Sequence, residues 1–105
     1  MENKNPLYYE AHVTIEPVFD ERLENFRKIC ELYEFRVADL LFKKRKHDTP
    51  QRSSFDAFCT GRSKEYEDLQ SRTCSLVNEL KNNNFEVWRY KIESTLLDSK
   101  FGSKL

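Results

Sequence analysis

The sequence predicts one α+β domain whose elements follow the order strand, helix, strand, strand, helix, strand. Side chains alternate between apolar and polar around residues 7–16 and 85–93, which is the period of a strand with one buried face. Apolar residues recur every three or four positions around residues 19–33 and 66–80, which is the period of an amphipathic helix. The 105 residues, 38% of them hydrophobic, suit a single domain with one small core.

The first strand covers residues 7–16 and ends before Pro17, because proline has no N–H to donate to a ladder. Its buried side is expected to hold Leu7, Tyr9, Ala11, Val13 and Ile15. Asp20 can cap the following helix, since its carboxylate can accept hydrogen bonds from the free N–H groups of the first turn. The buried face of that helix is predicted to hold Phe19, Leu23, Phe26, Ile29, Cys30 and Tyr33.

A second strand is predicted over residues 36–45, with Ala38, Leu40 and Phe42 on its buried side. The polar residues 43–52 then form a basic loop that begins with Lys43-Lys44-Arg45-Lys46. The third strand alternates from Phe55 to Thr60, and Gly61 is expected to end it.

Ser63 can cap the second helix, which stops at Asn82-Asn83-Asn84 because asparagine tolerates the left-handed conformation found at helix ends. Its buried face is predicted to hold Tyr66, Leu69, Thr73, Leu76, Val77 and Leu80. In the fourth strand, 85–93, one side carries Trp88, Tyr90 and Ile92, and the other carries Val87, Arg89, Lys91 and Glu93. The domain therefore spans residues 1–105, with a core over about 7–93 and a tail over 94–105.

This order of elements is the β-α-β-β-α-β pattern of the ferredoxin-like fold. Right-handed crossovers interleave its two halves and give a four-stranded antiparallel sheet of order 4-1-3-2, with both helices on one face. The other face stays open. It is expected to carry Tyr8, Glu10, His12, Thr14, Asp56, Phe58, Thr60, Arg89, Lys91 and Glu93.

The bulk composition argues against several classes of protein. The 18 basic and 18 acidic residues give a net charge of zero, whereas binding nucleic acid through bulk charge requires a basic balance. The chain shows neither a signal-peptide pattern nor an apolar run near the ~20 residues that span a bilayer, so a cytoplasmic protein without membrane contact is expected. The three cysteines lack metal-ligand spacing, which predicts reduced thiols, no metal site and no cofactor.

The most informative motif is His12-Val13-Thr14-Ile15. A strand places His12 and Thr14 on the same face, where the imidazole can transfer a proton near neutral pH and the hydroxyl can hold a phosphate oxygen. The motif resembles the H-Φ-[ST]-Φ sequence, with Φ apolar, of the 2H phosphoesterase superfamily. This resemblance implies a catalytic role for His12 and Thr14 and a nucleotide or RNA phosphate ester as the ligand.

That superfamily uses two such motifs, so the resemblance implies a second histidine. His47, followed by Thr49, is the other histidine of the chain and the third catalytic candidate. Its segment departs from the pattern, because Asp48 and Pro50 stand at the apolar positions and the region is predicted to be a loop. The candidate substrate-binding residues are Arg89 and Lys91, which can neutralise a phosphate, and Tyr8 and Phe58.

Three functions remain open. The first is a non-catalytic interaction domain that forms a homodimer through the open face or a free edge strand, where Tyr8, Leu41 and Phe58 leave apolar area. The second is a phosphoesterase or phosphate-ester-binding protein of 2H-like character. The third is a small RNA-binding domain in which Tyr8 and Phe58 stack on bases.

Overall fold

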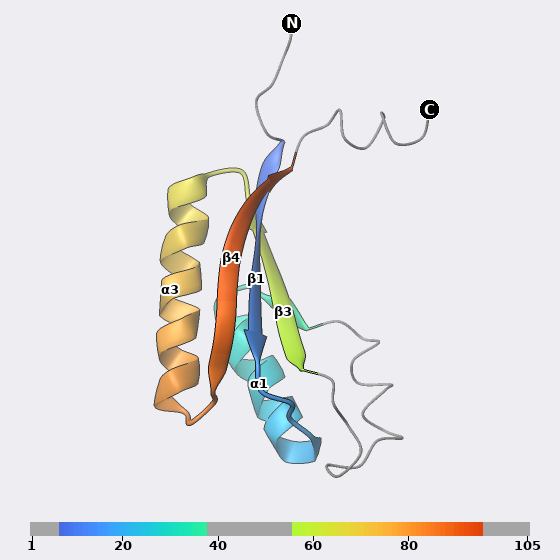
Figure 1. Ribbon diagram of the computed structural model, residues 1–105. Helices are drawn as coiled ribbons and strands as arrows, with labels where there is room; N and C mark the ends of the chain where they lie inside the picture. Colours follow the sequence, from blue (N-terminus) through green and yellow to red (C-terminus); the bar gives the residue numbers. More distant parts are fainter. Residues whose placement is uncertain (1–6, 38–55, 96–105) are drawn as a thin grey trace, which may run out of the picture.

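The computed structural model describes residues 7–37 and 56–95, and within them it shows the predicted order of elements (Figure 1). The elements are β1 (Tyr8–Ile15), α1 (Asp20–Leu32), β2 (Arg36–Val37), β3 (Ala57–Ser63), α3 (Tyr66–Asn82) and β4 (Val87–Thr95). The sheet is antiparallel with the order β2-β3-β1-β4, which is the predicted order read from the other edge. The prediction of an α+β, ferredoxin-like fold is confirmed. Predictions for the basic loop, and for Ala38, Leu40, Leu41, Phe42 and His47, lie outside the described residues.

The core lies between the sheet and the two helices, which pack on the same side of the sheet (Figure 1). The central strand β1 contributes Ala11, Val13 and Ile15, none of which is exposed to solvent. The helices bury residues that the periodicity predicted, namely Leu23, Phe26, Cys30, Leu69, Thr73, Leu76, Val77 and Leu80. Alternation in the strands and the three-four spacing in the helices therefore converge on one core.

Gly61 does not end β3, contrary to the prediction. It lies inside the strand, paired with Ala11 of β1, and β3 continues to Ser63. A Cβ at Gly61 would lie 2.7–2.9 Å from ring atoms of Phe35. The glycine is therefore in the strand because a buried ring occupies the space where a side chain would be.

Neither Asp20 nor Ser63 is the N-cap residue that the sequence predicted, although both lie next to the helix starts. The N-cap of α1 is Phe19 rather than Asp20, because the carbonyl of Phe19 accepts the first helical hydrogen bond, from Leu23. The N-cap of α3 is Glu65, and Ser63 instead accepts a hydrogen bond from the Glu65 N–H at 3.1 Å. The predicted stop of α3 is correct, since the helix ends at Asn82.

The two helices end in the same way. After each C-cap comes one residue with positive φ, Glu34 at 61° and Asn84 at 67°. The next residue, Phe35 or Phe85, is buried and its N–H returns to a carbonyl in the last helical turn, at 2.9 and 3.0 Å respectively. This pattern is the Schellman motif with its apolar residue after the turn.

The two βαβ halves also share their spacing, with equivalent residues fifty positions apart. Phe35 and Val37 of the first half correspond to Phe85 and Val87 of the second, and all four contact the core. The buried α1 residues Leu23, Phe26 and Cys30 likewise correspond to Thr73, Leu76 and Leu80 of α3. The molecule is thus built from two halves with a similar pattern of buried residues.

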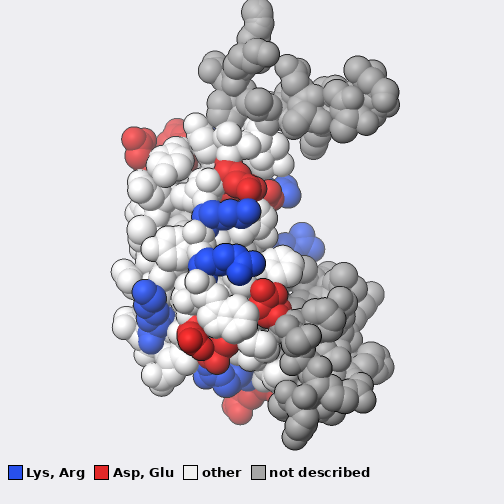
Figure 2. Space-filling view, in the orientation of Figure 1, with Lys and Arg blue, Asp and Glu red and all other residues white. Residues whose placement is uncertain are grey.

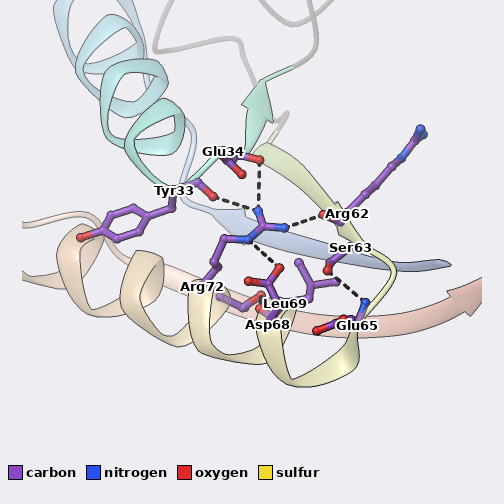
Figure 3. Close-up of polar contacts among 9 residues, drawn as sticks. Tyr33, Glu34, Arg62, Ser63, Glu65, Asp68, Leu69 and Arg72 are labelled. Atoms are coloured by element: carbon purple, nitrogen blue, oxygen red, sulfur yellow. Dashed lines mark hydrogen bonds and ion pairs between the residues drawn. The ribbon is translucent and has the colours of Figure 1, made fainter.

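An arginine of each helix donates hydrogen bonds to backbone carbonyls just after the end of the other helix. In α3, one Nη of Arg72 donates to the carbonyls of Tyr33 and Glu34 at 3.0 and 3.4 Å, and the other donates to the carbonyl of Arg62 in β3 (Figure 3). In α1, Arg22 donates to the carbonyl of Asn84 at 3.1 Å. Each guanidinium lies over the phenylalanine that follows that carbonyl, 5.8 Å from the Phe35 ring centre and 4.3 Å from that of Phe85.

Candidate functional site on the open sheet face

The strand register brings the polar candidates onto one face. His12 is opposite Lys91 of β4 and Thr60 of β3, and Thr14 is opposite Arg89 and Phe58. Residues directly opposite each other in an antiparallel pair point to the same face. The shared face of His12, Thr14, Arg89 and Lys91 is therefore as the sequence predicted, while their binding of phosphate stays a prediction.

His12 is at the centre of a network of charged and polar groups. Its Nε2 lies 3.6 Å from a carboxylate oxygen of Glu10 and 3.8 Å from one of Glu93. Its Nδ1 lies 3.5 Å from the hydroxyl of Thr60. The imidazole therefore lies between two carboxylates and a hydroxyl, all within 3.8 Å of its ring nitrogens.

Each carboxylate of the network also has a cation of its own. Arg62 binds Glu10 at 3.0 Å, and Lys91 binds Glu93 at 3.0 Å. The hydrogen bond and the charge of Lys91 hold the pKa of the Glu93 carboxyl below its ordinary value, and the charge of His12 lowers it further. In Figure 2 basic and acidic side chains are interspersed on this side of the molecule, without a large patch of one sign.

This network is poorly suited to an anionic phosphate group. A phosphate beside the imidazole of His12 would meet the carboxylates of Glu10 and Glu93 at short range, and like charges at such distances repel. Lys91, expected to neutralise the phosphate, is already paired with Glu93. The neighbouring Thr14 is only 7% exposed, so little of it is accessible to a ligand.

Arg89 differs from the other cations of this face. It is exposed, and among the described residues it forms no ion pair or side-chain hydrogen bond. It is opposite Thr14 in the register, two residues along β4 from Lys91. Arg89 is therefore the basic group on this face best placed to meet an incoming partner.

The two aromatic candidates lie at opposite ends of the face. Tyr8 is half-buried near the start of β1, and the guanidinium of Arg62 lies 5.3 Å from its ring centre. Phe58, in β3, is 39% exposed. Arg62 was missed by the sequence-based prediction because β3 was expected to stop before it. The sequence offered one indication that β3 continues, because a single glycine inside an alternating strand can mark the close approach of another group rather than the end of the strand.

Acid–base catalysis needs a second proton carrier within reach of the same substrate. His47 lies outside the described residues. The titratable groups nearest the His12 Nε2 are Glu10 and Glu93, and each is held by Arg62 or Lys91. The described part of the face therefore shows one imidazole within an ion-pair network rather than two opposed proton carriers.

A second surface feature is the outer edge of the sheet at β4. Within the described residues no strand pairs with this edge, because β4 ends the order β2-β3-β1-β4. Trp88 and Tyr90 were expected on the side that the helices cover, yet they are 48% and 52% exposed. For Tyr90 the reason is that α3 packs mainly on β1 and β3, which leaves an open groove between α3 and β4 that Tyr90 lines.

Residues 7–37 and 56–95 contain no group of three or more His, Cys, Asp or Glu residues arranged to hold a metal ion. Neither helix in those ranges has both the length and the apolar character needed to cross a membrane. Comparisons with protein-family models, with curated proteins and with solved structures found no match to this chain. Its function must therefore be inferred from its own residues.

Proposed function

We propose that this chain is a non-catalytic protein-interaction domain that associates with a second copy of itself through the free edge of β4. The observation that carries the proposal is the exposure of Trp88 and Tyr90 on that edge strand. Large aromatic side chains contribute strongly to interfaces, and an unpaired strand edge offers a row of backbone donors and acceptors to a partner.

The edge carries Arg89 and Lys91, charges of the kind that discourage pairing, but it is neither short nor interrupted by proline. β4 is nine residues long and contains no proline. Its one irregularity is a bulge where Thr14 and Ile15 of β1 face Arg89 and Val87, so that Trp88 is the extra residue. From Arg89 to Thr95 the strand is regular, which leaves a continuous segment for pairing.

Light scattering tests self-association directly. The expected mass at micromolar concentration is twice the chain mass of 12.6 kDa. Tyr90→Lys should give a monomer, because a lysine on an edge strand opposes pairing and a half-exposed side chain contributes little to folding. Leu32→Lys is the matched control, since Leu32 is 71% exposed at the end of α1, and this variant should remain dimeric.

The same experiment separates the edge from the open face as the contact surface. Phe58 is the exposed apolar residue of the open face, so Phe58→Lys should leave the dimer intact if β4 forms the interface. A monomeric Phe58→Lys beside a dimeric Tyr90→Lys would assign the interface to the open face. A wild-type chain that stays monomeric throughout would refute self-association.

A phosphate-ester site is the second candidate, and the observation that favours it is the exposed Arg89 beside Thr14, which forms no ion pair with the residues that the structure describes. Titration with 2′,3′-cyclic nucleotides and with a cyclic-ended RNA tests this candidate. A site of this kind predicts binding that Arg89→Ala abolishes, together with hydrolysis that His12→Ala abolishes while binding remains. Absence of binding to every ligand of the set would leave His12 with the role that its contacts show, a member of an ion-pair network.

A further inference from the structure

We infer that the partner copy pairs its β4 antiparallel to this one, in a register centred on Ile92. This inference rests on the proposed self-association and adds the orientation and the residue pairs. A dimer with a twofold axis through two equivalent strands must pair them antiparallel, and each residue then faces a partner at the same distance on the other side of the axis. Fixing the central residue therefore fixes every pair.

The charges along β4 distinguish the possible registers. Arg89, Lys91 and Glu93 all project from the open face. An axis at Tyr90 would place Arg89 opposite the partner's Lys91. An axis at Lys91 would place two lysines opposite each other; it would also pair Arg89 with the partner's Glu93, but it would bring the bulge at Trp88 into the ladder, opposite the partner's Ser94. An axis at Glu93 would bring two carboxylates together. Like charges directly opposite each other destabilise a strand pair, so these three registers are disfavoured.

An axis at Ile92 removes every such conflict. It pairs Lys91 with the partner's Glu93, and Glu93 with the partner's Lys91, so the open face gains two opposite-charge pairs. Two isoleucines meet at the axis, and Arg89 faces the partner's Thr95. This register also pairs the whole of Arg89–Thr95, which is the regular part of the strand beyond the bulge at Trp88.

The helix side of the strand is compatible with the same arrangement. Ile92 and Tyr90 line the groove between β4 and α3, together with Tyr66, Gln70 and Cys74 of the helix. Because α3 packs mainly on β1 and β3, the two α3 helices of a dimer would be separated by at least three strand spacings, about 14 Å. That separation exceeds ordinary helix packing, so side chains such as Tyr66 and Tyr90 have room between the helices.

A charge exchange between two single variants tests the register. Lys91→Glu alone places carboxylates opposite each other in two pairs, and Glu93→Lys alone does the same with ammonium groups. Each variant should associate at least about tenfold more weakly than the wild type. Mixed in equal amounts, the variants should form a heterodimer, because position 91 of each chain then faces an opposite charge at position 93 of the other.

The mixture also shows whether both variants fold, since only folded chains can restore the dimer. Lys28→Glu and Glu21→Lys make the same changes of charge on exposed positions of α1, and they should leave the wild-type dimer unchanged. Single variants that dimerise as tightly as the wild type would overturn the register while leaving self-association intact. The same conclusion would follow if the mixture remained monomeric while circular dichroism showed both variants to be folded.

Cys74 provides an independent geometric test. It is the exposed thiol among the chain's three cysteines, and it lines the same groove as Ile92, which places it beside the proposed axis. A bis-maleimide with a flexible linker of about 15 Å should join two wild-type chains through this cysteine. The product should be lost in Cys74→Ser and strongly reduced in Lys91→Glu. A cross-link of equal yield in Lys91→Glu would overturn the register.

Discussion

Gly61 occupies a position in the core where a side chain has no room. It lies in the middle of β3 opposite Ala11, and the ring of Phe35 packs directly against its Cα. Phe35 is itself held in place, since it is 2% exposed and follows the left-handed residue that ends α1. A side chain at position 61 would therefore displace a ring that has no free space to enter.

Gly61→Ala should lower the free energy of unfolding by about 1–3 kcal/mol, because the added methyl group overpacks the site against Phe35. Urea denaturation followed by circular dichroism measures this loss. Phe35→Leu introduced with Gly61→Ala should cost less than the sum of the two single changes, since the smaller side chain makes room for the methyl group. Strict additivity would show that the ring is not the obstacle.

The Glu93 carboxyl should titrate below the ordinary glutamate range, because Lys91 stabilises its ionised form by a hydrogen bond and by charge. A carboxyl whose folded pKa is lowered stabilises the fold above its unfolded pKa, and this contribution disappears as the pH falls through the folded pKa. NMR titration of the side-chain carbonyl carbon measures it. Lys91→Met should raise the Glu93 pKa, whereas Lys81→Met, a change at an exposed position of α3, should leave it unchanged.

The three cysteines should differ sharply in reactivity. A hydrogen bond with Cys59 and burial raise the pKa of the Cys30 thiol, and both of these cysteines are fully buried. Cys74 is exposed on α3. A thiol reagent should therefore label one cysteine in the native protein and three after denaturation, because the thiolate is the reactive form and must be reached by the reagent. Labelling of Cys30 at the rate of Cys74 would contradict the packed core.

At the scale of elements, the junctions between the helices and the following strands hold the two halves together. The carbonyls that follow a helix have no partner within it, and they carry part of the negative end of the helix dipole. Arg72 satisfies two of these carbonyls at the end of α1, and Arg22 satisfies one at the end of α3. The side chain of Arg72 is 17% exposed and that of Arg22 is 45% exposed.

Arg72→Ala should therefore destabilise the protein more than Arg22→Ala. The expected loss for Arg72→Ala is about 1.5–3 kcal/mol, which is typical of charged hydrogen bonds in partly buried positions. Arg27→Ala is the surface control and should cost less than about 1 kcal/mol, because the ion pairs of Arg27 within the described residues are with Glu24 and Glu31 of its own helix. Urea midpoints for the three variants provide the comparison. Equal losses for Arg72→Ala and Arg27→Ala would show that the carbonyl contacts contribute nothing.

Local sequence predicted the elements better than their ends. Alternation located β1 and β4, and the asparagine run located the end of α3, because these features depend on neighbouring residues. The continuation of β3 through Gly61 depended on Phe35, which is distant in sequence, so it could not be read locally. The exposure of Tyr90 was missed for a similar reason, since it depends on which strands α3 covers.

For the candidate site, the sequence correctly predicted which residues of β1, β3 and β4 share one face of the sheet, whereas Asp56 lies before β3. The alternation of side chains along each strand is enough for this result, because residues directly opposite each other in β1, β3 and β4 project to the same side of the sheet. The ion pairs could not be predicted, since they depend on the register and on side-chain conformations. The carboxylates beside His12 thus became apparent only when Glu10 and Glu93 were placed around it in three dimensions.

At the scale of the whole molecule, one continuous core joins both halves. Phe26 of α1 is fully buried and packs against Phe85, which precedes β4, with ring centres 6.0 Å apart. Arg22 and Arg72 cross between the same halves. Neither half can therefore bury its apolar residues alone, and the domain should unfold as one unit.

Phe26→Ala should lower the free energy of unfolding by about 3–5 kcal/mol and should not separate the transition into two steps. The protein's single tryptophan, Trp88, reports on β4 by fluorescence, while circular dichroism reports on the helices. The two transitions should coincide in the wild type and in the variant. Separate midpoints would mean that the halves unfold independently.

The central position of β1 in the sheet limits when this strand can pair with its neighbours during folding. β1 pairs with β3 and β4, and its His12 is 48 residues from Thr60 and still farther from Lys91. Such long-range pairing slows folding, because a large loop must close before any contact forms. During synthesis β1 leaves the ribosome before either partner, and β4 follows last. The most apolar strand of the sheet must therefore wait for nearly the entire domain to be translated before both of its edges are covered.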